Sequence, residues 1–593
     1  MRRESVGSVA TAIALLITGC GRSSPPASAP ATAPAAAAAT ACPANDSGLT
    51  LPAGFCASVF ADGIGHARHL VAAPNGFVYV NTWSSEYYGN DPTHPGGFLV
   101  ALKDTQGTGK ADVIRRFGAT MEDGAKGGTG IALFKNQLYA EIDGSIVRYA
   151  LSEHDPVPQG APEVIVSGLP LTGDHPMHPF AIDSAGMLYV DVASATNSCQ
   201  KQDRTLESPG HDPCKELQLR SGIWRYDTHK TDQKFSSKER HVTGIRNAGG
   251  IAVDAADRIY ATQHGRDQLA ENWPKLYTPE QGATLPAEEL LRIEAGTDYG
   301  WPYCYYDAAQ GKLVLAPEYG GDGGKAVGRC AQLRAPIAAF PAHWAPTALT
   351  FYQRTQFPER YRNGAFIAFH GSWNRAPFQQ DGYNVVFQPF KDGQPAPGCE
   401  IFADGFAGSI KSPEGAQHRP TGIAYGPDGA LYISDDVKGR IYRVTYAGQP
   451  QGQSAPPPTA CPSASAPPAP AAAMSEDEAK LPVPPSSTRE TVVLGSRLYH
   501  AQGDATTTCV GCHGAHATGT PLGPDLTDAE WLWSDGSVAG IAKTIGDGVP
   551  QPKRYRNSMP AAGGAQLTAE QISAIATYLW AAGHAAQSSG SMH

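Results

Sequence analysis

The sequence predicts an all-β six-bladed β-propeller followed by a small all-α domain. Three observations lead to this prediction. A strand–turn–strand motif recurs six times between residues 49 and 447. Two stretches rich in Ala, Pro and Ser flank that region, and the segment at 488–584 shows helical periodicity around a short cysteine motif. With 593 residues, the chain is long enough for two or more domains.

Each repeat consists of small or apolar residues, a turn containing Gly, Asn or Asp, and an alternating β-strand. The six copies lie at 73–80, 131–139, 182–190, 253–260, 361–368 and 425–433. Repeated four-stranded sheets at irregular intervals of roughly 50 residues or more are typical of a β-propeller. The widest interval contains residues 274–341, which are predicted to form long loops on one face of the propeller.

Composition sets the domain boundaries. The segments at 21–48 and 448–487 are rich in Ala and Pro and are predicted to be a tether and a linker. They bracket the propeller at 49–447, and the all-α domain follows at 488–584. The tail at 585–593 is predicted to be disordered. The net charge is −10 and no long Lys/Arg block appears, so no nucleic acid is expected as a partner.

Residues 1–20 resemble a bacterial lipoprotein signal peptide. Two arginines precede an apolar run at 9–17 that is too short to span a bilayer. The run ends in Ile-Thr-Gly-Cys, which resembles a lipobox, so cleavage before Cys20 and lipidation of its thiol are expected. An ordinary signal peptide is the alternative. The protein would face the periplasm on a lipid anchor in the membrane, and the lack of Asp after Cys20 favours the outer membrane.

Cysteine usage fits an oxidising compartment. Of eleven cysteines, eight remain once Cys20 and the closely spaced Cys509 and Cys512 are set aside. This even number allows two local and two long-range disulfides. The candidate pairs are Cys199–Cys214, Cys304–Cys330, Cys56–Cys399 and Cys42–Cys461. Sequence alone does not fix their connectivity.

The cysteine motif is Cys509-Val510-Gly511-Cys512-His513, the attachment signature of c-type haem. Each thiol can add across a haem vinyl group, and His513 can reach the iron. A zinc or redox pair is the alternative, but no two further zinc ligands follow at suitable spacing. Met559 is the best distal ligand, with an ordinary core methionine as the alternative. A His/Met pair raises the haem potential, as suits an electron acceptor.

The region around this motif resembles the small monohaem cytochrome c fold throughout. Pro524 stands where those proteins place a loop whose carbonyl holds the histidine ring. The pattern Thr568-x-x-Gln571 predicts a capping box that opens a C-terminal helix. An upstream helix carrying Gly495 and Tyr499 could cross this helix at Tyr578. The chain is therefore expected to end in an electron carrier.

Polar residues gather near the predicted inner strand ends of the propeller, at 173–178, 244–250, 262–267, 370–375 and 417–422. Five strings are informative together. They are Leu-Pro-Ala-Gly-Phe-Cys-Ala at 51–57, Gly-His-Ala-Arg-His-Leu at 65–70, Asp-Tyr-Gly-Trp-Pro at 298–302, Gly-Ser-Trp-Asn-Arg at 371–375 and Asp-Asp-Val at 435–437. With them, residues 49–447 resemble the six-bladed sugar dehydrogenases that depend on pyrroloquinoline quinone (PQQ), in particular the L-sorbosone dehydrogenase-like branch.

The resemblance implies a PQQ site in the central channel. PQQ carries three carboxylates, which guanidinium groups bind bidentately. The implied contacts are Arg246, Asn247, His264, Trp344, Thr347, Trp373, Asn374 and Arg419. Salt bridges between blades are the alternative role for the arginines, and inter-blade packing is the alternative for the aromatic residues. The family also binds Ca²⁺, here matched by the backbone carbonyls of Gly265 and Arg266.

Sugar oxidation needs a base at the anomeric hydroxyl, and histidine serves near neutral pH. His175 matches the family's catalytic histidine, Asp174 could orient it, and His178 is the alternative base. The resemblance implies oxidation of an aldose, a pyranose or a sorbosone-type sugar. Electrons would then pass to haem c in the same chain and on to a respiratory acceptor, namely a cytochrome, a copper protein or an oxidase.

Three other functions are weighed against this one. A non-catalytic propeller that binds a partner, with the cytochrome as an electron relay, would not be expected to gather His175, Arg246 and Arg419 in its channel. A hydrolytic propeller such as a lactonase would have no need of a haem. An eight-bladed quinoprotein alcohol dehydrogenase would show more than six hairpins and an adjacent Cys-Cys pair, which this sequence lacks.

Overall fold

The structure is a computed structural model. It describes residues 46–83, 95–376, 378–413, 415–448, 457–469, 480–485, 487–500, 509–514, 516–520, 522–528, 530–555, 558–565 and 567–590. The lipidation predicted at Cys20 lies outside these residues, as does Cys42. Among the helices of the described part, none is long and apolar enough to cross a membrane.

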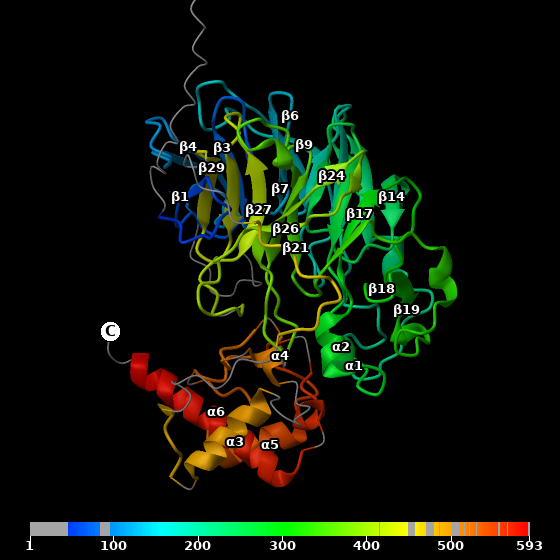
Figure 1. The fold of residues 1–593 in the computed structure, drawn as a ribbon, viewed down its shortest axis with the longest axis vertical. Helices are drawn as coiled ribbons and strands as arrows, with labels where there is room; N and C mark the ends of the chain where they lie inside the picture. Colours follow the sequence, from blue (N-terminus) through cyan, green and yellow to red (C-terminus); the bar gives the residue numbers. More distant parts are fainter. Residues whose placement is uncertain are drawn as a thin grey trace, which may run out of the picture.

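Six four-stranded antiparallel sheets form the blades of a propeller, as predicted (Figure 1). Blade 1 contains β2 (Ala67–Ala72), β3 (Val78–Thr82), β4 (Leu99–Lys103) and β5 (Val113–Phe117). Blade 2 contains β6 (Ile131–Phe134), β7 (Gln137–Ile142), β8 (Ser145–Ala150) and β9 (Glu163–Ser167), with β13 (Gln233–Lys234) added in parallel to β9. Blade 3 contains β10 (Phe180–Ile182), β11 (Met187–Val192), β12 (Gly222–Asp227) and β14 (Arg240–Thr243).

The chain continues around the ring in the same way. Blade 4 contains β15 (Ile251–Val253), β16 (Ile259–Gln263), β17 (Glu288–Ile293) and β20 (Ala338–Phe340). Blade 5 contains β21 (Pro346–Phe351), β22 (Ala365–His370), β23 (Tyr383–Gln388) and β26 (Glu400–Ala403). Blade 6 contains β27 (Pro420–Tyr425), β28 (Leu431–Asp435), β29 (Arg440–Tyr446) and, from the start of the chain, β1 (Phe55–Ala61). Each predicted hairpin supplies the first two strands of a blade.

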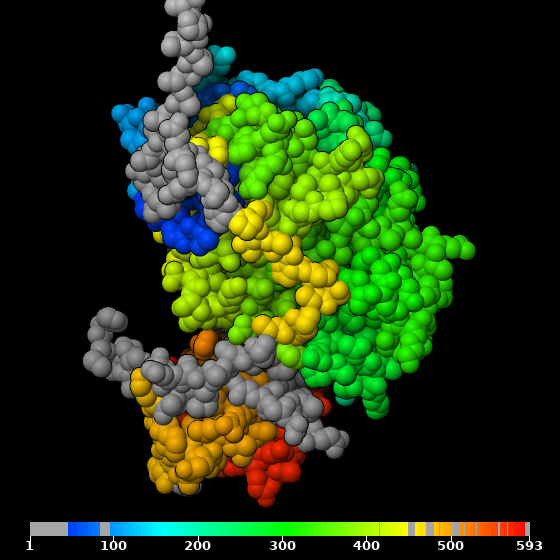
Figure 2. All heavy atoms as spheres, in the orientation of Figure 1, coloured from blue at the N-terminus to red at the C-terminus, as the bar shows by residue number. Residues whose placement is uncertain are grey.

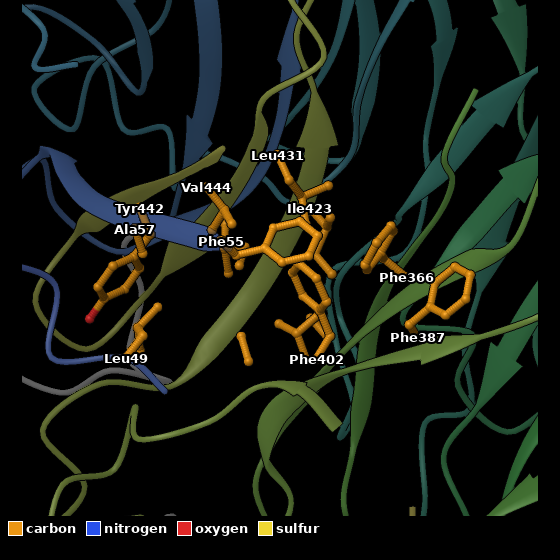
Figure 3. Packing of buried hydrophobic residues seen from close by; sticks show 14 of the residues in the cluster. Leu49, Phe55, Ala57, Phe366, Phe387, Phe402, Ile423, Leu431, Tyr442 and Val444 are labelled. Atoms are coloured by element: carbon orange, nitrogen blue, oxygen red, sulfur yellow. The ribbon is translucent and has the colours of Figure 1, made fainter. Parts of the chain in front are cut away.

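The hydrophobic core is divided among the junctions between blades. The first strand of each blade contacts the first strands of both neighbours, and six buried clusters fill the six junctions. Figure 3 shows the cluster between blades 5 and 6, where Phe55 of β1 packs among aromatic rings. Its ring centroid lies 4.8 Å from that of Phe357 and 5.0 Å from that of Phe402, edge to face. Such pairs contribute about 0.5–1.5 kcal/mol each beyond burial, so they secure the strand that closes the ring.

Long loops project from one end of the propeller. The interval predicted to carry them holds α1 (Leu269–Asn272), α2 (Pro279–Thr284) and the hairpin β18 (Cys304–Asp307)–β19 (Lys312–Leu315). A second small hairpin, β24 (Phe390–Lys391)–β25 (Gln394–Pro395), lies between β23 and β26. The disulfides Cys199–Cys214 and Cys304–Cys330 tie the projecting loops together, so both predicted local pairs are confirmed.

The predicted long-range disulfides are wrong. Cys399 bonds to Cys461, with Cα atoms 5.4 Å apart, so neither Cys56–Cys399 nor Cys42–Cys461 exists. Cys56 is also disulfide-bonded. The physical reason is that residues 457–469, which were predicted to belong to a free linker, return along blade 5 and bring Cys461 to Cys399. Figure 2 shows this segment in yellow, lying on the light green surface of blade 5.

The C-terminal domain contains α3 (Arg489–Tyr499), α4 (Cys509–His513), α5 (Val538–Asp547) and α6 (Ala569–Gly590). Helices α3 and α6 cross as predicted. A Cβ atom on Gly495 would lie 1.9 Å from the Ala574 carbonyl oxygen, so only glycine permits this approach. The rings of Tyr499 and Tyr578 lie 5.3 Å apart at the same crossing.

The ends of α6 give one confirmation and one correction. Gln571 N–H donates to Thr568 Oγ1 and Thr568 N–H donates to Gln571 Oε1, which completes the predicted capping box. The tail at 585–593, predicted to be disordered, instead continues α6 as far as Gly590. Its Ala-Ala-Gln start favours helix, and the Trp580 and His584 rings stack with centroids 3.6 Å apart just before it.

Candidate functional site

The candidate site lies at the end of the propeller where the chain enters the first strand of each blade. Because the first two strands of each blade are antiparallel, the ends of the second strands meet these entry segments. Contacts between blades join them. His69 Nε2 lies 2.8 Å from the Thr347 carbonyl oxygen, and His370 Nε2 lies 2.8 Å from Asp436 Oδ1. Residues from distant parts of the chain therefore line one central channel.

His175 stands on the segment that enters blade 3. Its Nδ1–H donates to the Ser194 carbonyl oxygen at 2.9 Å, which fixes the neutral tautomer with a lone pair on Nε2. Within the described residues, Nε2 makes no hydrogen bond, and the side chain is only partly buried. This ring can accept a proton from a ligand in the channel, as a general base must.

Burial and, to a lesser extent, the nearby Arg246 guanidinium lower the pKa of His175 to about 3. The sign follows from the charged form: burial penalises imidazolium, so the ring stays neutral until the pH approaches 3. In cofactor-free protein labelled with ¹³C-histidine, the His175 signal, assigned by its loss in His175→Ala, is expected not to titrate between pH 5 and 8. A histidine peptide should titrate near about 6.5 under the same conditions. A midpoint inside that window for His175 would refute this environment.

His178, the alternative base, is 1% exposed. Its Nδ1 lies 2.8 Å from Glu141 Oε1, and its backbone N–H donates to the same carboxylate. Glu141 also accepts from the backbone N–H of Thr129 at 2.8 Å, so its carboxylate joins His178 at the entry to blade 3 to blade 2. Since a catalytic base must reach its substrate, the geometry favours His175 over His178.

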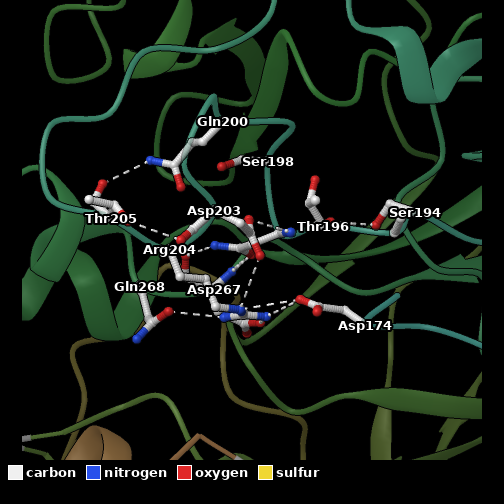
Figure 4. Close-up of polar contacts among 12 residues, drawn as sticks. Asp174, Ser194, Thr196, Ser198, Gln200, Asp203, Arg204, Thr205, Asp267 and Gln268 are labelled. Atoms are coloured by element: carbon white, nitrogen blue, oxygen red, sulfur yellow. Dashed lines mark hydrogen bonds and ion pairs between the residues drawn. The ribbon is translucent and has the colours of Figure 1, made fainter. Parts of the chain in front are cut away.

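Asp174 does not orient His175, contrary to the prediction. Its carboxylate accepts from Arg204 Nη2 at 2.8 Å, and Ser194 supplies the orienting bond to His175 instead. Arg204 also donates to Gln268 Oε1 at 3.0 Å and pairs with Asp267 at 3.3 Å (Figure 4). Against the effect of burial, the Arg204 charge lowers the pKa of Asp174, and Arg246 followed by Arg204 lowers the pKa of Asp267.

The sequence analysis missed Arg204 and gave no role to Asp267, which it included only in the polar segment 262–267. Arg204 lies on the loop between β11 and β12, which the Cys199–Cys214 disulfide closes. The signal was therefore present in the sequence, as a charged Asp-Arg pair inside a disulfide-closed loop. The guanidinium lies 5.9 Å from the centre of the Trp373 ring, so this loop covers the predicted cofactor residues.

The two arginines predicted to bind PQQ differ in their surroundings. Arg246 is 3% exposed, and its guanidinium binds Asn197, the Gly265 carbonyl oxygen and Asp267 at 2.8–3.1 Å. These contacts match the structural alternative. Arg419 is partly exposed and donates to two backbone oxygens, of His370 and Gly371, both at 2.9 Å. Within the described residues it forms no salt bridge, so its charge remains available for an anionic ligand.

The other predicted PQQ residues fall into two groups. Asn247 and His264 are partly exposed and bonded to each other, since Asn247 Nδ2 donates to His264 Nδ1 at 3.2 Å. Trp344 is 0% exposed and packs against Phe369 at the junction between blades 4 and 5. Thr347 is also buried, and its hydroxyl lies 3.5 Å from the Ala368 carbonyl oxygen and 3.4 Å from that of Pro420.

Asn374 is 3% exposed, and neither its Oδ1 nor its Nδ2 has a hydrogen-bond partner in the described part of the chain. An unsatisfied buried amide costs about 1–3 kcal/mol, which a polar ligand would relieve. Asn374 neighbours the partly exposed Trp373. Together with Arg419 and His175, this amide offers the anion-binding and polar groups that a tricarboxylate quinone requires, so the residues fit PQQ.

The calcium assignment does not fit this arrangement. The Gly265 carbonyl oxygen accepts from Arg246 Nη1 at 2.9 Å, so a positive charge already occupies its vicinity. The Arg266 side chain forms a buried ion pair with Glu318. Among the described residues, the one cluster of potential metal ligands is Cys199, Cys214 and Glu216, whose sulfurs form a disulfide. Ca²⁺ binding at Gly265 and Arg266 would need Arg246 to move.

A second site lies in the C-terminal domain. A cavity with mostly apolar walls is lined by Cys509, Cys512, His513 and Met559. His513 Nδ1–H donates to the Pro524 carbonyl oxygen at 3.0 Å, as predicted, which leaves Nε2 for the iron.

The cavity is fixed by backbone contacts on both sides. Met559 exchanges two backbone hydrogen bonds with Val549, of 2.7 and 2.9 Å, which hold the predicted distal ligand at the cavity wall. A Cβ atom on Gly523 would lie 3.1 Å from His513 Cε1, so glycine leaves room for the imidazole. The residues fit a c-type haem with His513 and Met559 as its axial ligands.

Comparison with known families agrees with this two-part organisation. A family model described as TrAA12-like matches residues 49–447, and one described as Cytochrome c matches residues 492–582. The six-bladed propeller is thus a TrAA12-like domain, and a cytochrome c domain follows it in the chain. The chain belongs to the TrAA12-like family.

Two curated relatives match part of the chain. An uncharacterized protein of Borreliella burgdorferi is 31% identical over 224 residues, which cover 36% of this chain and 50% of that protein. A pyrroloquinoline quinone-dependent pyranose dehydrogenase of Coprinopsis cinerea is 24% identical over 235 residues, which cover 35% of this chain and 31% of that protein. The chain thus spans half or less of the length of these relatives.

Two solved structures share the propeller fold. One is the family AA12 protein of Trichoderma reesei, with a TM-score of 0.53 and 19% identity over 67% of this chain and 98% of that chain. The other is the PQQ domain of the Coprinopsis cinerea pyranose dehydrogenase in its holo form, with a TM-score of 0.53 and 18% identity over 67% of this chain and 97% of that chain.

Proposed function

We propose that this protein is a quinohaemoprotein sugar dehydrogenase. It oxidises an aldose, a pyranose or a sorbosone-type sugar with PQQ, passes the electrons to haem c in the same chain, and delivers them to a respiratory acceptor. The observation that carries the proposal is the neutral His175 ring, whose Nε2 makes no hydrogen bond within the described residues, in the channel of a TrAA12-like propeller that shares a chain with a haem c cavity.

The residues of the channel have distinct tasks. Bound PQQ supplies the quinone that takes up two electrons as hydride. His175 Nε2 takes the proton of the anomeric hydroxyl, while the Ser194 carbonyl holds the ring in the required tautomer. Arg419 binds a cofactor carboxylate by a charge-assisted bond, and Asn374 offers its amide to the cofactor. In the C-terminal domain, His513 and Met559 hold the iron at a potential suited to electron uptake.

The experiment is a sugar panel on purified protein reconstituted with PQQ, with and without Ca²⁺. The absorbance band of reduced haem c reports electron arrival. Reduction that requires both a sugar and PQQ is expected. If the haem is reducible by dithionite but no aldose, pyranose or sorbosone-type sugar reduces it, the propeller is not a sugar dehydrogenase and a binding module becomes the better hypothesis. The arm without Ca²⁺ decides whether that ion is needed.

The location of the protein is a proposal of its own. The lipobox ending in Cys20 supports a lipid anchor that faces the periplasm, and the outer membrane is favoured. Cys20→Ala is expected to move the protein from the membrane fraction to the soluble fraction, because the acyl chains would be lost. Immunoblots of both fractions measure this, with Cys304→Ala as the control for loss of an unrelated cysteine. Membrane association that survives Cys20→Ala would rule out lipidation there.

A further inference from the structure

Part of the predicted linker is bound to the propeller. Residues 457–469 extend the edge of blade 5 next to β26. Ile401 N–H donates to the Thr459 carbonyl oxygen at 2.8 Å, Ala460 forms an antiparallel bridge with Glu400, and the Cys399–Cys461 disulfide makes the attachment covalent. Added strands commonly dock on an exposed sheet edge in this way. We call residues 457–469 the strap.

The far end of the strap reaches the end of the propeller that carries the site. Gln379 N–H donates to the Ala469 carbonyl oxygen at 3.1 Å. Gln379 belongs to the loop between β22 and β23, and the same loop carries Trp373 and Asn374. The strap therefore leads the chain from the outer edge of blade 5 to the mouth of the channel, just before the C-terminal domain begins.

The haem cavity lies near the same loops. In Figure 1, α4 is at the propeller side of the C-terminal domain, close to α2. Helix α4 carries Cys509, Cys512 and His513, which line the haem cavity, so this wall of the cavity lies at the propeller side of the domain.

We propose that the strap fixes the cytochrome domain over the site end of the propeller, so that α4 and the haem cavity that it lines face α2. The purpose of this arrangement, electron delivery over a short path, rests on the proposed function. The arrangement itself rests on the strap contacts and on the position of α4 close to α2.

The strap shortens the effective tether. From Ala469 to Lys480 the chain can extend at most about 40 Å, at roughly 3.5 Å per residue. Without the strap, the free chain would start near Gly448 and could extend about 110 Å by the same measure. Because effective concentration falls roughly as the −3/2 power of tether length, releasing the strap is expected to lower it about fivefold.

The test uses full-length protein with Cys399→Ser and Cys461→Ser, compared with Cys304→Ser and Cys330→Ser as the matched loss of a disulfide outside the strap. Small-angle scattering of the cofactor-free proteins measures the radius of gyration, and stopped-flow absorbance measures haem reduction by sugar. Only the strap variant is expected to expand and to reduce its haem about fivefold more slowly. Oxidation of sugar with a soluble dye acceptor should stay within about twofold of the wild type, since the channel is untouched.

The outcomes separate the two proposals. An unchanged radius of gyration and an unchanged haem reduction rate in the strap variant would refute the proposal that the strap fixes the cytochrome domain. Absence of dye-linked sugar oxidation in the wild type, together with expansion of the variant, would overturn the proposed function and leave the strap standing. Should the double serine variant not fold, Gln379→Pro removes the N–H that binds Ala469 and keeps the disulfide. Expansion is again the expected result, and an unchanged radius would count against the strap.

Discussion

Replacing His175 with alanine is expected to lower sugar-driven haem reduction by about 10² to 10⁴-fold, the usual contribution of a general base. The loss should appear in kcat, because the base accepts the proton in the transition state. PQQ should still bind through Arg419 and its neighbours. Steady-state kinetics on the best sugar of the panel, together with a PQQ titration by fluorescence quenching, measure both quantities. Reduction of the haem by dithionite should be normal.

Two controls make the result specific. His154→Ala removes an exposed histidine remote from the channel and should leave turnover unchanged. His178→Ala leaves the buried Glu141 carboxylate without its partner, so its main expected effect is a lower melting temperature. Near-full turnover in His175→Ala would falsify the catalytic assignment, and a loss of turnover confined to correctly folded His178→Ala would transfer the role to that residue.

The second large effect is expected at the haem. Met559→Leu keeps the bulk of the side chain but removes the sulfur, so packing around the cavity should change little. Loss of the thioether should lower the reduction potential by a sizeable part of the roughly 0.8 V range that axial ligands set. Spectroelectrochemical titration measures the potential, and stopped-flow absorbance should show slower electron uptake from the sugar-reduced propeller.

A variant that restores a ligand separates ligation from packing. Met559→His should again give six-coordinate iron, but at a lower potential than the native pair, because His/Met ligation is what raises it. If Met559→Leu has the native potential, another residue such as His516 must bind the iron. The Met559 side chain would then only line the haem cavity.

The parts of the fold that sequence predicts well depend on local patterns. Each blade begins with a turn between two alternating strands, so hairpins such as that at 425–433 are visible in a short window. The haem motif is equally local, because both thiols and His513 lie within five consecutive residues. The Pro524 carbonyl could be predicted because it belongs to a motif only eleven residues from the histidine that it holds.

The errors involve residues that meet only after folding. Asp174 was paired with its neighbour His175 because the two are adjacent in sequence. In the structure, Arg204 from another loop forms an ion pair with the Asp174 carboxylate instead. Arg246 lies in the predicted motif, but its guanidinium donates hydrogen bonds to Asn197 and Asp267, which come from other parts of the chain. No spacing rule indicates which charged groups a propeller channel collects, because its lining comes from every blade.

The pairing of β1 with β29 has a consequence for how the chain can be made. Phe55 lies opposite Tyr446, so blade 6 joins residues that are almost the whole propeller apart in sequence. Such non-local pairing is slow to form, and until then β29 presents an open strand edge that invites association with other chains. The ring is complete only when its last blade has emerged. A nascent propeller that stops short of Arg440 therefore leaves Phe55 and its strand with no partner, however well the first five blades have formed.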